Sequence, residues 1–187
     1  PDLVELPADR PRPAAASRAG AAHEFEIPRA TVDLIERGAR DYGCTPFMIV
    51  HAALAALIAR LGATDDIAIG TPIAGRGRPE LDPMIGMFVN TLVLRTKVDG
   101  NAGFAELVAA ARATDLEAYA HADVPFDTVV DVVDPPRSAA FAPFTQIWLT
   151  FDQSLLPDTA GAAVGGGEID GVHVEPVSAG APAARVD

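Results

Sequence analysis

The sequence predicts an α/β domain in which a mixed sheet of about five strands packs against about four helices. Stretches with apolar residues at helical spacing alternate with short runs rich in β-branched residues, and helices between strands are typical of a layered α/β fold. The chain has 187 residues, of which 49% are apolar and 21% are charged. This length and composition suit one soluble globular core, and a second independent core is not expected.

The amino-terminal part of the chain is rich in proline. Residues 1–22 carry four prolines and few apolar anchors, so we expect a linker or extended arm. Residues 23–27 predict a short strand, and residues 30–42 predict a helix that ends at Gly43. The apolar face of this helix consists of Val32, Ile35, Ala39 and Tyr42. The domain proper is therefore expected to span residues 23–187.

A second helix is predicted to begin at Thr45 and Pro46, because threonine can cap free amides and proline suits a first helical turn. This helix is apolar nearly all round, so we expect it inside the domain. Its longest apolar run, residues 47–61, falls short of the roughly 20 residues that span a bilayer. It therefore predicts a buried helix and no membrane segment.

Two further helices follow. Residues 102–120 predict a helix whose inner face carries Phe104, Leu107, Val108 and Ala111. Pro125 is expected to start a short helix with a buried stripe of Phe126, Val129, Val130 and Val133. Both helices would cover the sheet.

The remaining strands are predicted from alternation and β-branched content. An alternating segment over residues 66–73 and a mainly apolar segment over residues 85–98 indicate two of them, and residues 144–151 indicate another. Residues 157–167 are rich in glycine and alanine and are expected to form a mobile loop before a last strand over residues 168–177.

The charge balance excludes some partners. A net charge of -12 argues against nucleic acid and against an anionic membrane surface, because both require a concentrated basic face. The single Cys44 excludes an internal disulfide and any zinc site built from several cysteines, which fits a reducing cytoplasm. No secretory signal pattern is expected in the proline-rich amino-terminal segment.

The residues predict no catalytic set. Cys44 precedes a helix, where amide dipoles could lower its pKa, but we expect a turn residue, because a lone cysteine among Gly, Thr and Pro is more often that. His51 lies within the buried helix and is expected to be paired in the core. His121 and Asp123 could ligate a metal, but helix capping accounts for both, so we expect no metal site. The other histidines, His23 and His173, lie on separate elements.

A glycine-rich segment covers residues 70–80 but lacks both nucleotide-binding glycine patterns. It places Arg76 and Arg78 on a loop of an acidic protein. Two interpretations stay open for these arginines: they pair with Glu80 and Asp82, or they bind a ligand.

Four stretches together resemble the condensation domains of nonribosomal peptide synthetases. DDIAIGTPIAGRGRPELDPMIGMFVNTLVLR (65–95) is similar to the strand, loop and strand around the family's IGxFVNT motif, and HADVPFDTVVDVV (121–133) is similar to its HQDxPFExLV motif. ELPADRPRP (5–13) resembles the segment that links two lobes, and PPRSAAFAPFTQIWLTF (135–151) resembles a later motif. The resemblance extends over nearly the whole chain, to residues 185–187, which are similar to the family's Lys-Phe-Asp.

The family's HHxxxDG motif, with the histidine implicated in amide formation, does not occur in this sequence. That motif belongs to the amino-terminal lobe of a two-lobed fold like that of chloramphenicol acetyltransferase. The resemblance therefore implies the carboxy-terminal lobe alone, ending before that lobe's usual end.

The resemblance also implies a site. The two lobes face each other across a tunnel that receives the 4'-phosphopantetheine arm of a carrier protein, so the chain itself would bind no cofactor and carry no catalytic residue. The residues expected to bind the arm or line the groove are Gly75, Arg76, Phe88, Asn90 and Thr91. Those expected to bind the acidic carrier are Arg29, Arg37, Arg76 and Arg78.

Two functions follow as hypotheses. The first is a non-catalytic adaptor that recruits a loaded peptidyl carrier protein to neighbouring domains of a synthetase. The alternative is the carboxy-terminal half of a catalytic condensation domain, which forms an amide between carrier-bound substrates with its base elsewhere. A free-standing acyltransferase that uses coenzyme A is disfavoured, because the histidines present do not form the required base.

Asn90 and Thr91 stand out because they interrupt an apolar strand, where an unpaired polar group costs roughly 1 to 3 kcal/mol. Alternation places them on opposite faces, so one partner cannot satisfy both. We expect Asn90 to face the groove and bond an amide of the arm, and Thr91 to bond within the domain. The alternative, in which both are satisfied internally, stays open.

Overall fold

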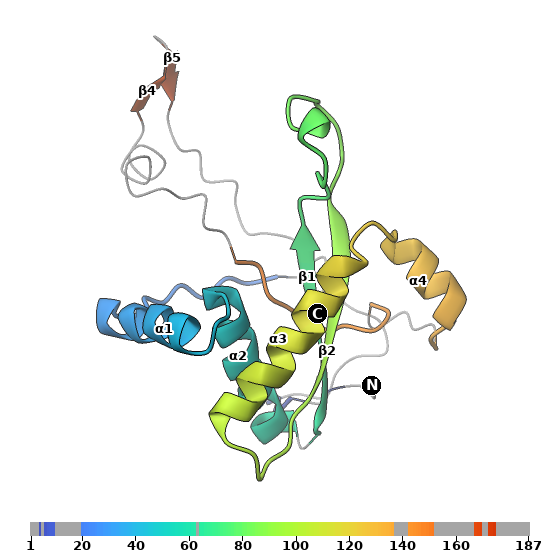
Figure 1. The fold of residues 1–187 in the computed structure, drawn as a ribbon. Coiled ribbons are helices and arrows are strands. Elements are labelled where there is room, and N and C mark those ends of the chain that lie inside the picture. The colour runs from blue at the N-terminus through green and yellow to red at the C-terminus, as the bar shows by residue number, and fades with distance from the viewer. Residues whose placement is uncertain are drawn as a thin grey trace. The chain divides into compact units, whose positions relative to one another are not determined.

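The computed structural model describes residues 4, 6–9, 20–62, 64–136 and 142–151, together with the backbone of residues 167–169 and 172–174. The chain forms two compact units (Figure 1). The larger unit comprises Pro1–Ser17, Phe25–Leu149 and Val186–Asp187, and the smaller comprises Arg18–Glu24 and Thr150–Arg185.

The larger unit is a helix and sheet structure. Its sheet has the strand order β2-β1-β3, with β2 antiparallel and β3 parallel to the central strand β1. In chain order its elements are α1 (Arg29–Asp41), α2 (Pro46–Gly62), β1 (Asp66–Ile73), a 3-10 turn η1 (Pro79–Leu81), β2 (Asn90–Lys97), α3 (Phe104–Ala120), α4 (Phe126–Val133) and β3 (Ile147–Trp148). The α/β class, the mixed sheet and the four helices are confirmed, but in the described part of the chain this sheet has three strands.

The other two described strands form a separate hairpin in the smaller unit. β4 (Gly167–Ile169) pairs antiparallel with β5 (Val172–Val174). The single strand expected over residues 168–177 is therefore two short strands, and residues 175–177 lie outside the described part. Most of residues 1–22 and of the loop expected over 157–167 also lie outside it.

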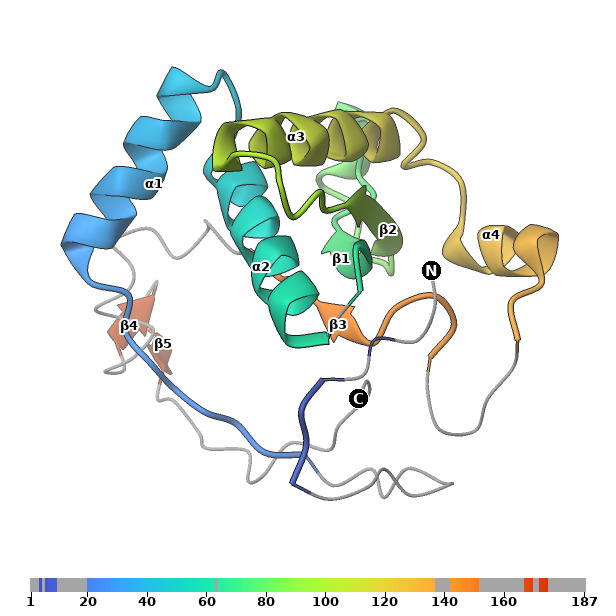
Figure 2. The ribbon, with the colours of Figure 1, turned by 90° about the horizontal axis from the view of Figure 1, so that it is seen from below.

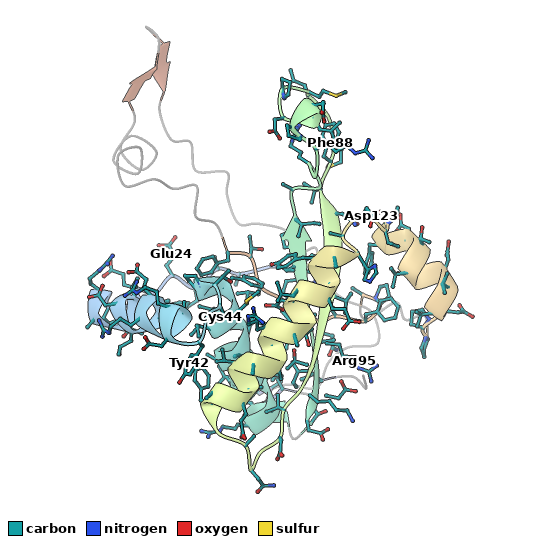
Figure 3. All side chains as sticks on the ribbon, in the orientation of Figure 1. Glu24, Tyr42, Cys44, Phe88, Arg95 and Asp123 are labelled. Atoms are coloured by element: carbon teal, nitrogen blue, oxygen red, sulfur yellow. The ribbon has the colours of Figure 1, made fainter. Side chains whose placement is uncertain are left out.

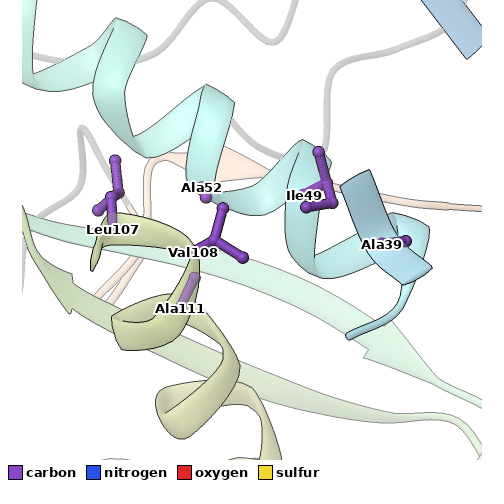
Figure 4. Packing of buried hydrophobic residues seen from close by; sticks show 6 residues of the cluster. All are labelled: Ala39, Ile49, Ala52, Leu107, Val108 and Ala111. Carbon is purple, nitrogen blue, oxygen red and sulfur yellow. The ribbon is translucent and has the colours of Figure 1, made fainter. Parts of the chain in front are cut away.

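The core of the larger unit is organised around α2. One side of α2 packs against α1 and α3 in a cluster of Ala39, Ile49, Ala52, Leu107, Val108 and Ala111 (Figure 4). Farther along, Ala55 and Ile58 pack on Ile67 and Ile69 of β1. Full burial of side chains such as Ile69 and Leu94 contributes about 1.5 to 3 kcal/mol each. Figure 2 shows α3 and α2 close to the sheet and α4 beyond its edge.

The expected helix boundaries are confirmed. Gly43 has φ 61° and ends α1 in the left-handed conformation that glycine adopts without strain. Thr45 caps α2, because its Oγ1 accepts a hydrogen bond from the Met48 amide at 3.3 Å.

Two strands were predicted too long, and a third predicted strand is absent. β2 begins at Asn90 instead of residue 85, because its partner β1 ends at Ile73, directly opposite Asn90. β3 is limited to Ile147–Trp148, since Phe144 has φ 64° and breaks the extended backbone. Residues 23–27 form no strand. Periodicity predicts strand potential, whereas length depends on a partner.

Some surfaces expected to be buried are exposed. On α2, Leu57 and Leu61 lie on the surface, and Phe104 is exposed at the start of α3. α4 has no buried residue, and Val132 is 79% exposed and Val133 58% exposed. The apolar pattern of α4 is thus present, but the described residues do not cover it.

In the described residues no individual helix has the length and apolarity to cross a membrane, although the bent pair α1 and α2 meets the criterion by length and composition alone.

Candidate functional site

Asn90 joins the two sequence motifs that carry the family resemblance. Its Nδ2 donates to the carbonyl oxygens of Ala122 and Val124 at 3.0 and 2.8 Å, and its Oδ1 accepts from the Phe126 amide at 3.1 Å. Phe126 is the first residue of α4, whose N-cap Pro125 provides no side-chain cap. Asn90 therefore caps a helix that lies more than 30 residues away in sequence.

These bonds sharpen the prediction for Asn90. Both Nδ2 hydrogens are used within the domain, so Asn90 has internal partners, as the second sequence interpretation allowed. An amide oxygen accepts two hydrogen bonds, and Oδ1 receives one from Phe126. Any bond from Asn90 to a pantetheine arm is thus restricted to acceptance of an N–H by Oδ1, and this binding role remains a prediction, as does that of Thr91.

Asn90→Ala is expected to release α4 from the sheet while the core helices stay folded. The variant loses three hydrogen bonds, each with a net contribution of about 0.5 to 1.5 kcal/mol after exchange with water. Amide exchange across Phe126–Val133 should accelerate by about tenfold to a hundredfold. Thr91→Val is the matched control on the neighbouring residue. Unchanged exchange in α4 of the Asn90→Ala variant would contradict the capping role.

Gly75 shapes the loop between β1 and β2. Its φ is 64°, and a Cβ atom at this position would lie 1.7 Å from the Phe88 carbonyl oxygen. Only glycine combines this conformation with such a close approach. Gly75 therefore brings the two ends of the loop together, ahead of any contact with a ligand.

Arg76 and Phe88 brace the same loop. The Arg76 guanidinium lies over the Phe88 ring with Cζ 4.3 Å from the centroid, and Nη1 donates to the Leu81 carbonyl. Of the two interpretations left open for Arg76, an ion pair with Glu80 or Asp82 is not formed among the described residues, and ligand binding remains a prediction. The guanidinium contacts the backbone carbonyls of Leu81 and Asp82. Arg76 therefore stabilises the loop through a cation–π contact and a backbone bond.

The loop between β1 and β2, residues 74–89, presents apolar side chains to solvent. Figure 3 shows Phe88 in the loop that projects from the sheet, and Asp123 at the turn before α4. The exposed apolar residues of the loop are Met84, Ile85, Met87 and Val89, and Ile85 is fully exposed. Several exposed apolar side chains on one loop are typical of interaction surfaces.

The four arginines expected to bind a carrier lie in two places. Arg76 and Arg78 lie on the loop between β1 and β2, whereas Arg29 and Arg37 lie on α1. Arg29 forms ion pairs with Asp33 at 2.8 Å and Glu36 at 3.6 Å. Within the part of the chain that the structure describes, Arg78 forms no ion pair. The structure therefore does not bring these arginines into one patch.

His51 is paired in the core, as the sequence predicted. Its Nδ1 lies 2.8 Å from Oδ1 of Asp115, and both side chains are fully buried. The contact has ion-pair distance without hydrogen-bond geometry, and Nε2 lies 3.4 Å from the Thr96 hydroxyl. Burial raises the pKa of the nearby Tyr119, and the Asp115 carboxylate raises it further. His51 is thus inaccessible as a base for an external substrate.

Two further candidates, Cys44 and His121, lie at helix ends. Burial raises the pKa of the Cys44 thiol, and Arg112 offsets part of that rise, which is the direction opposite to activation by helix dipoles. His121 is exposed at the end of α3. Among residues 20–62, 64–136 and 142–151, no three histidine, cysteine or acidic side chains gather to hold a metal ion.

Two paired carboxylates were not predicted from the sequence. Asp115 continues the buried face of α3 four residues after Ala111, which was a readable signal. Arg95 binds Asp66 through two hydrogen bonds of 2.9 and 2.6 Å, and this contact holds the pKa of Asp66 below its usual range. That pair depends on the β1–β2 register, which periodicity alone did not fix.

The fold and the linked motifs place the chain among domains of nonribosomal peptide synthetases. The family model described as "Condensation domain" matches residues 1–162. The chain belongs to the condensation domain family.

Two curated relatives illustrate this membership. The chain is 49% identical over 154 residues to a probable non-canonical nonribosomal peptide synthetase, CymA, from Salinispora arenicola. The aligned region covers 82% of the chain and 2% of the relative. The chain is 39% identical over 170 residues to a component of linear gramicidin synthase from Brevibacillus parabrevis, covering 90% of the chain and 3% of the relative. The chain therefore spans only a few percent of the length of these relatives.

Two solved structures share the fold. The X-domain from teicoplanin biosynthesis has 33% identity and a TM-score of 0.71, covering 78% of this chain and 32% of that one. A four-domain nonribosomal peptide synthetase bound to AMP and glycine has a TM-score of 0.82 at 23% identity, covering 98% of this chain and 13% of that one. The expected condensation-domain-like fold is confirmed.

Proposed function

We propose that this chain is the carboxy-terminal lobe of a nonribosomal peptide synthetase condensation domain and that it holds the 4'-phosphopantetheine arm of a carrier protein. The carrier, in its loaded form, and the neighbouring synthetase domains are the partners. The product would be a secondary metabolite, as for the gramicidin synthase relative. In this proposal the lobe contributes binding and orientation, and the cofactor arrives on the carrier.

One observation carries the proposal: Asn90 fastens the FVNT motif to the HADVPF turn. Oδ1 accepts one hydrogen bond within the domain and has capacity for a second, which an amide of the arm would donate. Thr91 follows on β2, and Arg78 at the loop offers an exposed charge for the phosphate of the arm. Rigid placement of such groups lowers the entropic cost of binding a flexible arm.

The proposal assigns no base to this chain. The sequence has no HHxxxDG motif, and His51 is buried against Asp115. General base catalysis requires a side chain within hydrogen-bond reach of the proton that it removes. Amide formation would then rely on a histidine outside these residues.

A non-catalytic adaptor is the second candidate function. It is favoured by the similarity to the X-domain, which has also been solved as a complex with OxyB from teicoplanin biosynthesis. A condensation-like fold in that system therefore binds a protein partner. The coding sequence next to this chain separates the two settings: HHxxxDG encoded directly upstream would exclude the adaptor, and an unrelated sequence there would exclude the catalytic setting.

Carrier binding can be measured on the labelled 187-residue chain by titration with apo, pantetheinylated and aminoacyl-loaded carrier. We expect amide shifts over residues 74–90 and 121–126, strongest for the loaded form. Arg78→Ala should weaken binding and reduce its dependence on salt, because exposed charges steer association.

Arg37→Ala on α1 is the matched control for the loop arginine. If Arg37→Ala weakens carrier binding more than Arg78→Ala does, the carrier binds at α1, which would contradict its proposed placement at the loop. No shift with any carrier form at about 1 mM would reject the proposed function.

A further inference from the structure

α4 presents an apolar stripe that the described residues leave uncovered. The helix has no buried residue, and Val129, Val132 and Val133 are 36%, 79% and 58% exposed. Positions three and four apart lie on one side of a helix, so these valines form a single stripe. Apolar side chains that gather on one exposed surface cost free energy in water and are typical of docking surfaces.

A row of carboxylates lies beside this stripe. Asp127 and Asp131 are exposed, and their spacing of four residues puts them on one side of α4. A helix turns by roughly 100° per residue, which places the exposed Thr128 between this pair and Val132. Residues 121–134 contain no lysine or arginine, and in the described part of the chain none of their carboxylates forms an ion pair.

The carboxy-terminal end of α4 concentrates this negative charge. Its last turn has no basic residue, and Asp134 follows as the C-cap with φ 46°. The macrodipole of a helix places partial negative charge at this end, so the carboxylates of Asp131 and Asp134 are unfavourable there. A cation supplied from outside the domain would remove this cost. The end of α4 therefore favours a positively charged partner.

The opposite side of α4 is anchored to the domain. Asn90 accepts a hydrogen bond from the Phe126 amide at 3.1 Å, and the Phe126 ring packs edge-on against Phe144 with centroids 6.2 Å apart. Phe126 and Val130 are half-buried. The helix is thus preformed with its acidic and apolar residues outward, and a preformed surface lowers the entropic cost of binding.

The combination of charge and apolar surface selects one class of partner. Such a partner must offer apolar side chains to the valines and cations to Asp127, Asp131 and Asp134, and a basic amphipathic helix supplies both. A second copy of the chain would bring two rows of carboxylates together, which is repulsive. An acidic carrier and an anionic membrane meet the same repulsion.

We infer that the outer face of α4 docks a basic amphipathic helix of a partner protein. This face consists of Asp127, Thr128, Val129, Asp131, Val132 and Val133. The valines provide the apolar contact, and the carboxylates set the orientation of the partner. The inference goes beyond the proposed function, because its partner is basic and therefore distinct from the acidic carrier.

The test uses a synthetic amidated peptide of about 18 residues, with leucine and arginine at amphipathic helical spacing. Titration of the isotopically labelled 187-residue chain should shift the amides of residues 123–134 saturably, with a Kd of about 1 to 100 μM at low salt. Val132→Ser should raise the Kd by at least about fivefold. Asp131→Asn should raise it by at least about threefold and reduce its dependence on salt.

Both variants change exposed side chains, so both should fold, and amide exchange over Phe126–Val133 checks that α4 persists. Leu57→Ser on α2 and Glu117→Gln on α3 are matched controls at exposed positions, with expected changes below about twofold. A peptide of the same composition in a scrambled, non-amphipathic order should bind at least about fivefold more weakly.

The inference is overturned if the scrambled peptide binds as tightly as the amphipathic one, since charge alone would then explain the attraction. An absence of saturable shifts at about 1 mM peptide, or equal affinity in Val132→Ser and wild type, would also overturn it. The same holds if an acidic carrier, rather than the basic peptide, shifts the outer face of α4. Failure of carrier binding near Asn90 would leave the peptide result unaffected and would count against the proposed function alone.

Discussion

Asp115→Ala is expected to destabilise the larger unit by about 3 to 5 kcal/mol, a large part of the stability of a small domain. The Asp115 carboxylate lies 2.8 Å from His51 Nδ1, and both side chains are fully buried. Loss of one partner leaves the other polar group in the core without compensation, which costs more than the pair itself contributes. Urea unfolding followed by far-ultraviolet circular dichroism measures the change.

The control for this prediction replaces both partners. His51→Leu combined with Asp115→Ala removes both polar groups, so it should recover most of the stability that the single variant loses. Glu117→Ala, exposed on the same helix, should change stability by less than about 0.5 kcal/mol. A loss below about 1 kcal/mol in Asp115→Ala would show that the pair has little energetic role.

The result also bears on how α3 is positioned. Asp115 on α3 lies at Nδ1 of the His51 ring, and Thr96 on β2 lies at its Nε2. The imidazole of His51 therefore connects α2 with α3 and with β2. Asn90 then holds the turn that follows α3. The position of the HADVPF turn therefore depends on two polar anchors, one buried and one at the edge of the sheet.

Periodicity predicted the elements that are stabilised locally. α1, α2 and α3 were placed within two residues at most boundaries, because an apolar stripe and helix caps are encoded in adjacent residues. β1 was predicted with the bounds that the structure has, since it alternates and is paired on both edges. The sequence therefore determined the layers well.

The missed features depend on residues that are distant in sequence. β2 starts where β1 ends, and a single strand pattern contains no information about its partner's end. Asn90 was singled out as a polar residue in an apolar run, but its bonds to Ala122 and Val124 require the tertiary fold. The motif residues were predictable, and their mutual contacts were not.

Gly75→Ala is expected to break the contact between Arg76 and Phe88 in the loop and to destabilise the larger unit by about 2 to 4 kcal/mol. Left-handed backbone costs an alanine about 1 to 2 kcal/mol, and the added Cβ would lie 1.7 Å from the Phe88 carbonyl oxygen. The backbone must shift to relieve this contact, which moves Phe88 away from the Arg76 guanidinium. Urea unfolding and amide exchange over residues 74–89 measure the global and local effects.

Gly77→Ala is the matched control, because nothing lies within 4 Å of its added Cβ and it should cost less than about 0.5 kcal/mol. Equal effects of the two substitutions would contradict a specific role of Gly75 in holding Phe88 against Arg76. If the loop only closes the strands, Gly75→Ala should leave carrier binding unchanged once stability is restored by lower temperature. If the loop carries Arg78 to the arm, as proposed, binding should fall in Gly75→Ala and persist in Gly77→Ala, since only the first moves the exposed arginine from its place.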